Sequence, residues 1–97
     1  MTRELKPFLN EEGLLTAYPA KRKMQIRALF YLAQKFESGR FYTEKEVNQL
    51  LMNWHTFSDW AMLRRDLCDL GFLGREGDGS AYWLKETQPD PAAFGLS

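Results

Sequence analysis

The chain has 97 residues, of which 44% are hydrophobic and 14% aromatic. This length suits one domain, and the apolar content is high enough to exclude a disordered chain or one that needs disulfides or metals to fold. The formal net charge is zero, with 13 basic and 13 acidic residues. Free-standing nucleic-acid binders are usually basic, so this balance counts against that class of function.

The sequence indicates a cytoplasmic protein. No apolar run approaches the length of a membrane span, and the start, Met1-Thr2-Arg3-Glu4, lacks the apolar stretch of a signal peptide. Cys68 is the single cysteine, so an internal disulfide is impossible.

The first third of the chain predicts an arm followed by a long helix. Apolar pairs flank an acidic turn that ends at Gly13, which favours a small hairpin or an ordered arm over residues 8–15. Pro19 marks the entry to a helix from about Ala20 to Phe36. Its apolar residues recur at helical spacing: Ile26, Leu29, Phe30, Ala33 and Phe36.

Two further helices, joined by a short turn, follow a short strand at residues 40–42. Thr43 and Glu46 have the spacing of a capping box, and the second helix then presents one apolar face. Ser58 or Asp59 caps the third helix, and Gly71 closes it in the left-handed conformation. The apolar faces consist of Val47, Leu50, Leu51 and Trp54 in the second helix and Trp60, Leu63, Leu67 and Leu70 in the third.

The last third predicts a β-hairpin. Two strand candidates, Phe72 to Arg75 and Ala81 to Lys85, flank a glycine-rich turn that contains Asp78-Gly79. We therefore expect an α+β fold, mainly α, of the winged helix-turn-helix type: three helices, a C-terminal hairpin wing and a short N-terminal arm. Residues 1–86 would form this domain, and residues 87–97 an extended tail.

Several strings in this order resemble a prokaryotic family catalogued as "domain of unknown function 2087". They are residues 42–48 (Tyr-Thr-Glu-Lys-Glu-Val-Asn), residues 63–67 (Leu-Arg-Arg-Asp-Leu), residues 71–75 (Gly-Phe-Leu-Gly-Arg) and Tyr82. The similarity runs from about Phe8 to Lys85. The resemblance implies a winged-helix-like domain. It also favours a function in gene regulation, since members of the family occur alone or attached to domains that resemble transcriptional regulators. It supplies no catalytic residues. Trp60 stands where the family tends to have a small residue.

The basic residues give the first function hypothesis, a nucleic-acid-binding module that contacts double-stranded DNA. Arg65 would read the major groove from the third helix, together with Met62 and Asp66 or Asp69, and the remaining cations would contact phosphates. Ordinary solvated surface is the alternative for each cation. The phosphate contacts would be Lys21, Arg22, Lys23, Arg27, Arg75 and Lys85.

Arg64 has a structural interpretation beside the functional one. It would pair with Glu44 or Glu46 of the preceding helix and fix the angle between the two helices, which is the interpretation we favour.

The alternative function is a protein–protein adapter without DNA binding. A neutral surface with aromatic residues suits an apolar contact with a regulatory protein or within a homodimer. The candidate contacts are Phe57, Trp60, Trp83 and Phe94.

Catalysis is not expected. His55 and Cys68 occur once each, which leaves no four-ligand zinc set and no nucleophile with a partner base. The glycines near the hairpin do not follow a strand and precede a helix, as phosphate-binding loops do. We therefore predict no enzyme activity, no cofactor and no metal.

Overall fold

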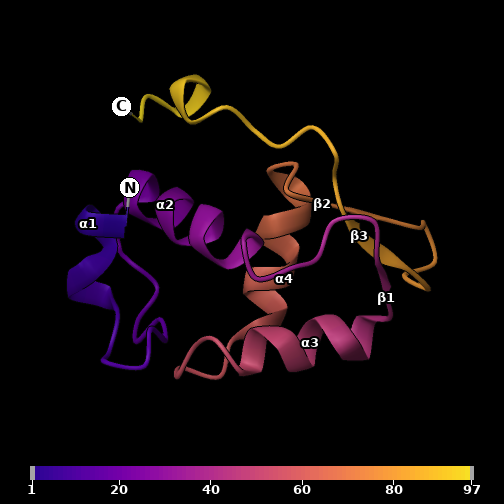
Figure 1. Ribbon diagram of the computed structural model, residues 1–97, viewed down its shortest axis with the longest axis horizontal. Coiled ribbons are helices and arrows are strands. Elements are labelled where there is room, and N and C mark those ends of the chain that lie inside the picture. The colour runs from indigo at the N-terminus through magenta and orange to yellow at the C-terminus, as the bar shows by residue number, and fades with distance from the viewer. Residues whose placement is uncertain (1, 97) are drawn as a thin grey trace.

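The computed structural model describes residues 2–96 and is α+β, with helices in the majority (Figure 1). The predicted order of helix, short strand, two helices and hairpin is confirmed, and short helical segments not expected from the sequence lie at both ends. In chain order the elements are α1 (Thr2–Leu5), the 3-10 helix η1 (Lys6–Phe8), α2 (Arg22–Ala33), β1 (Phe41–Tyr42), α3 (Glu44–Met52), α4 (Trp60–Asp69), β2 (Leu73–Arg75), β3 (Tyr82–Leu84) and the 3-10 helix η2 (Pro91–Phe94).

The three strands form one antiparallel sheet in the order β1-β3-β2 at one end of the molecule (Figure 1). Tyr42 lies opposite Tyr82, and Phe41 lies opposite Trp83. Successive side chains of a strand point to opposite faces, so the two tyrosines enter the core while Phe41 and Trp83 share the outer face. Tyr82 is accordingly buried and Trp83 half-buried.

Helices α3 and α4 each begin at a residue whose side chain caps the helix. Thr43 accepts a hydrogen bond from the Glu46 amide, and the Glu46 carboxylate accepts one from the Thr43 amide, which confirms the capping box. Asp59 caps α4 by accepting from the Met62 amide. Ser58 instead has a left-handed backbone, with φ of 55°.

Buried His55 holds the turn between α3 and α4. The Asp59 amide donates to its Nε2 at 3.0 Å, so Nε2 carries no proton and Nδ1 donates to the Leu51 carbonyl. The N-terminal arm fixes the same turn, because Leu15 is fully buried and forms a parallel bridge with His55.

Helix α2 is shorter than the sequence predicts, beginning at Arg22 and ending at Ala33 instead of spanning Ala20 to Phe36. Lys21 stands at the N-cap in an extended conformation and has no side-chain acceptor for capping. After Ala33 the chain tightens into turns that still bury Phe36. The periodic apolar pattern of the sequence therefore extends beyond the last residue of the helix.

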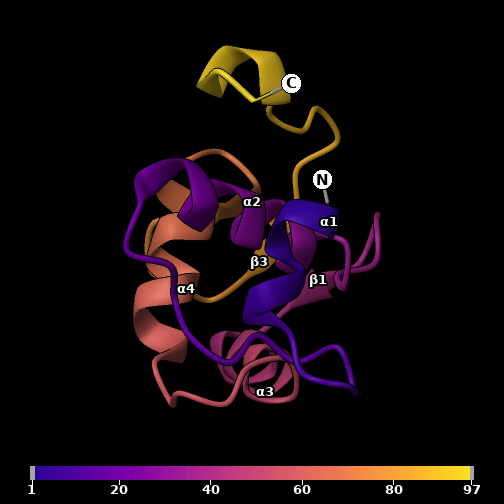
Figure 2. The same ribbon diagram turned by 90° about the vertical axis from the view of Figure 1, so that its left-hand side faces the viewer.

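The N-terminal arm contains both the predicted turn and an unpredicted helix. Leu9 and Leu15 form an antiparallel bridge around Gly13, as the hairpin interpretation requires. Ahead of them, α1 packs against α2 and buries Leu5 (Figure 2). Arg3 and Glu4 of this helix are exposed and Leu5 is buried, so no periodic apolar pattern reveals the helix in the sequence.

The C-terminal tail is not extended throughout. It crosses over α2 and carries η2 at its end (Figures 1 and 2). The Phe94 ring meets Phe30 edge-on at 6.2 Å, and Leu96 is buried. Gln88 anchors the start of the tail by donating to the carbonyls of Phe72 and Lys85.

Candidate nucleic-acid interface

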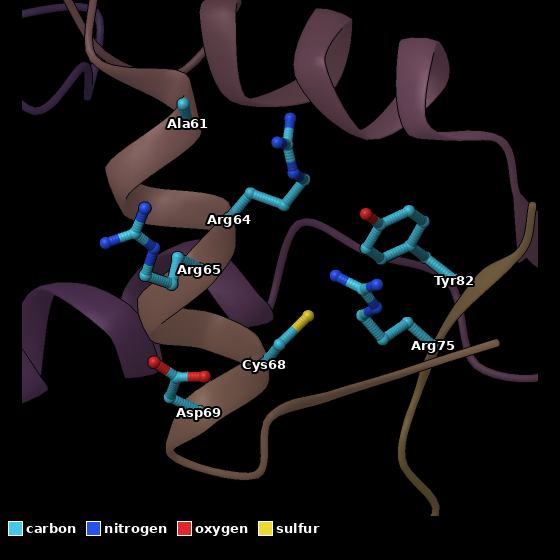
Figure 3. A pocket seen from close by; sticks show the side chains of 7 residues that line it. All are labelled: Ala61, Arg64, Arg65, Cys68, Asp69, Arg75 and Tyr82. Atoms are coloured by element: carbon cyan, nitrogen blue, oxygen red, sulfur yellow. The ribbon is translucent and has the colours of Figure 1, made fainter. Parts of the chain in front are cut away.

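A groove of about 540 Å³ separates the exposed side of α4 from the hairpin (Figure 3). Helix α4 contributes most of its walls, and β2 and β3 contribute one residue each. Three arginines and one acidic residue carry the charge of this groove. Its lining consists of Ala61, Arg64, Arg65, Cys68, Asp69, Arg75 and Tyr82.

Helical spacing explains which residues of α4 reach the groove. Leu63 and Leu67 are fully buried against the core. Ala61, Arg65 and Asp69 recur every four residues and are exposed along the opposite ridge. Helix α4 is therefore a scaffold with one buried face and one free face.

Arg64 links α4 to α3, as its structural interpretation predicts. Its Nη2 lies 3.4 Å from the Glu44 carboxylate, Nη1 donates to the Asn48 side chain, and the arginine is only 21% exposed. The Tyr82 hydroxyl donates to the same Glu44 carboxylate at 3.1 Å. Burial and this hydrogen bond raise the pKa of Tyr82. Arg64, Glu44 and Tyr82 thus join α4, α3 and the sheet.

Glu46, the other predicted partner of Arg64, pairs elsewhere. Its carboxylate lies 3.5 Å from Arg40 while it caps α3. Glu46 stands two residues after Glu44, and residues two apart on a helix do not share a face, so only one of them can reach α4.

Arg75 bonds to the hairpin turn. Its Nε and Nη2 donate to the carbonyls of Glu76 and Gly77, at 3.3 and 3.2 Å. In Figure 3 the guanidinium points from β2 towards α4, on the side where the Cys68 sulfur also lies. Arg75 is exposed, so its remaining donors face the groove and solvent.

Arg65 differs from the other two arginines of the groove. It is exposed, and within residues 2–96 its guanidinium forms no hydrogen bond or ion pair. All five of its N–H donors are therefore available to a ligand.

Asp66 does not face outward, contrary to the expectation from the sequence. It accepts a hydrogen bond from the Tyr18 hydroxyl at 2.7 Å and lies 3.4 Å from Arg22, with 18% of its side chain exposed. Burial and the Asp66 hydrogen bond together raise the pKa of Tyr18 well above its ordinary value. Asp66 therefore fixes the start of α2 against α4 and is unsuited to base reading.

The other predicted basic contacts separate into different regions. Lys21 and Lys23 are exposed at the start of α2, beside the α4 contact made by Arg22. Arg27 is half-buried, and its Nη1 donates to the Met24 sulfur. Lys85 lines a groove on the other side of the sheet, next to Phe41. Arg22 joins the start of α2 to α4 through Asp66, whereas Lys85 belongs to another surface.

The four aromatic residues proposed for protein contacts do not form one patch. Phe57 packs on the rings of Tyr18 and His55, and Phe94 packs on Phe30. Trp60 is half-buried at the first turn of α4. Trp83 alone meets a strongly exposed ring, that of Phe41.

Sequence reasoning missed Phe41, which is 70% exposed on β1. Its ring meets Trp83 edge-on, with 5.8 Å between centroids. The alternation of a strand was the available signal, because an inward Tyr42 requires an outward Phe41.

Cys68 and His55 have little freedom for chemistry. Burial raises the pKa of the Cys68 thiol, with Arg75 acting in the opposite direction. Both ring nitrogens of His55 are hydrogen-bonded within the turn. Over residues 2–96 we find no cluster of three or more His, Cys, Asp or Glu side chains that could hold a metal ion.

Fold and groove define a small, mainly helical α+β domain with an arginine-rich cleft. Residues 14–84 match the model of the family described as "uncharacterized protein conserved in bacteria", domain of unknown function 2087. The chain belongs to this family, as its sequence strings predicted. No curated protein and no solved structure matches it. None of the helices within residues 2–96 combines the length and apolarity needed to span a bilayer.

Proposed function

We propose that the domain is a winged helix-turn-helix that binds double-stranded DNA through α4 and the adjoining groove. The element order α2-β1-α3-α4-β2-β3 and the sheet order β1-β3-β2 support this assignment. In such folds the second helix of the helix-turn-helix pair enters the major groove. The observation that carries the proposal is that Arg64, Arg65 and Arg75 all line one groove beside α4.

The three arginines would have different roles. Arg65, with every donor free, is the candidate for contacts to base edges or to a phosphate. Arg64 and Arg75 are held by Glu44 and by the hairpin carbonyls, so they would supply positive charge in a fixed position. Lys21 and Lys23, exposed at the start of α2 on either side of Arg22, would contact the flanking phosphates.

The charge distribution predicts weak and strongly salt-dependent binding. The zero net charge gives little long-range attraction to DNA. The hairpin tip carries Glu76 and Asp78, and hydrogen bonds from Ser80 lower the pKa of Asp78, which keeps it ionised. We infer that this tip stays away from the phosphates and that the module acts by binding alone, without catalysis.

A salt series with a fluorescent mixed-sequence duplex tests the proposal. Fluorescence anisotropy should show binding at low salt that weakens steeply as salt is added, because each phosphate contact contributes about −0.9 to the logarithmic slope. Arg65→Ala should lower the affinity roughly fivefold or more and reduce the slope by about one contact.

Lys6→Ala is the matched control. Lys6 is exposed on the N-terminal arm and is not among the residues that line the groove beside α4. Its loss removes the same charge and should leave binding unchanged. Absence of binding at low salt with millimolar protein, or equal losses in both variants, would contradict the proposal.

One observation supports the alternative function, a protein–protein adapter. The exposed Phe41 ring beside Trp83 gives the outer face of the sheet an apolar surface that the DNA proposal does not use.

A further inference from the structure

The outer face of the sheet carries an aromatic pair, Phe41 and Trp83, that no element within residues 2–96 covers. Phe41 and Met52 are the exposed large apolar side chains of the described chain, at 70% and 46%. The Trp83 indole lies across Gly74, and the Phe41 ring meets it edge-on. All three strands therefore contribute to one surface at the end of the molecule (Figure 1).

A groove of about 500 Å³ runs beside this pair, with charges of both signs near it. Arg40 and Lys85 are its cations, and Glu86 is its acid. Just beyond, Glu37 lies 3.8 Å from Arg40. An apolar centre with a polar rim is the general organisation of protein interfaces.

The mixed signs decide between the possible occupants. The phosphates of a nucleic acid would be repelled by Glu86 and Glu37. A peptide that carries only positive or only negative charges would likewise be repelled by half of the charged residues on this surface. A second copy of the same surface carries both signs in equal measure. In a two-fold arrangement a cation of one copy can lie against an acid of the other. The zero net charge of the chain also removes long-range repulsion between copies.

We propose that this face binds a second copy of the chain in a two-fold dimer, with Phe41 and Trp83 near the axis. Aromatic residues at the centre of an interface commonly carry most of its binding energy. Neighbouring grooves extend the surface on both sides: one along α3 shares Arg40, and one at the end of α2 shares Leu84. This extension is needed because a stable interface buries about 800 Å² on each partner.

The dimer is independent of the DNA proposal. The groove beside α4 and the groove beside Phe41 have no lining residue in common. Dimerisation would leave both α4 helices free, and the dimer can exist whether or not the protein binds DNA.

Sedimentation velocity over a concentration series of the full chain tests the dimer. We expect a reversible monomer–dimer equilibrium that Phe41→Ser weakens by about tenfold or more. Met52→Ser is the matched control, because it removes an exposed apolar side chain outside the groove. Circular dichroism should show both variants folded, and Arg65→Ala should dimerise like the parent chain.

Charge exchange gives a second readout that does not depend on Phe41. Lys85→Glu and Glu86→Lys should each weaken self-association, and an equimolar mixture of the two should recover it as a heterodimer. A parent chain that stays monomeric up to millimolar concentration would overturn the proposal. So would a dimer that Phe41→Ser and Met52→Ser affect equally. Phe41-dependent binding of a single-stranded oligonucleotide by a strictly monomeric chain would assign the face to another partner.

Discussion

Single side chains in this domain obtain their roles from the partners that the fold gives them. Among the arginines of the groove, Arg64 is held by Glu44 and Asn48 and Arg75 by the hairpin turn, while Arg65 has no partner in the described chain. Residue type alone does not distinguish them. The difference arises because Arg64 faces α3 and Arg65, one helical position later, faces solvent.

Glu46 allows a test of the capping box at the same scale. The hydrogen bond from the Thr43 amide, helped by nearby Arg40, lowers the pKa of Glu46 below its ordinary value. A carboxyl whose pKa is lowered by folding stabilises the protein above its unfolded pKa, and this contribution is lost as the pH falls through the folded pKa. The stability advantage of the parent chain over Glu46→Gln should therefore be largest near neutral pH and shrink below about pH 4.

Urea unfolding at neutral and at acidic pH measures this difference. Glu12→Gln is the control, because the Glu12 carboxylate is exposed in the arm and accepts no hydrogen bond within residues 2–96. A stability difference for Glu46→Gln that does not change with pH would show that its charge contributes nothing to the cap.

At the scale of elements, the packing of the sheet depends on how closely the Trp83 side chain can approach the β2 backbone. Gly74 lies opposite Trp83, and a Cβ atom there would come within 2.5 Å of the indole. The Trp83 ring can lie flat across β2 only because this position has no side chain. The outer aromatic face therefore depends on a glycine in the neighbouring strand.

Gly74→Ala should destabilise the fold by about 1–3 kcal/mol, because the indole must move off β2. Chemical denaturation measures this loss. In the Trp83→Leu background the same substitution should cost clearly less, since the clash is with the ring. Equal costs in both backgrounds would place the strain in the β2 backbone instead.

The elements that the sequence predicted well are those with local signals. The capping box, the Asp59 cap, the left-handed Gly71 and the hairpin around Gly79 each involve residues within a few positions of one another. Helix α1 and η2 bury too few apolar side chains to leave a periodic pattern. The end of α2 was misplaced because Phe36 stays buried after the helix has ended.

At the scale of the whole molecule, the site was only partly predictable because it depends on contacts between distant segments. Of the predicted cations, Arg65 and Arg75 line the groove beside α4, and Lys85 lies on the outer sheet face instead. Tyr18 and Asp66 are 48 positions apart in sequence, and the hydrogen bond between them holds the Asp66 side chain inward. The sequence had predicted that Asp66 faces the ligand. The pairing of Phe41 with Trp83 also joins distant segments, and it places both rings on the outer face of the sheet.

Amide chemical-shift mapping with an unlabelled mixed-sequence duplex at low salt tests the central claim most directly. The DNA proposal predicts shifts concentrated along residues 61–69, at Arg75 and at the start of α2, and their loss as salt is raised. Shifts confined to the surface around Phe41 and Trp83, or no shifts at millimolar protein, would contradict it.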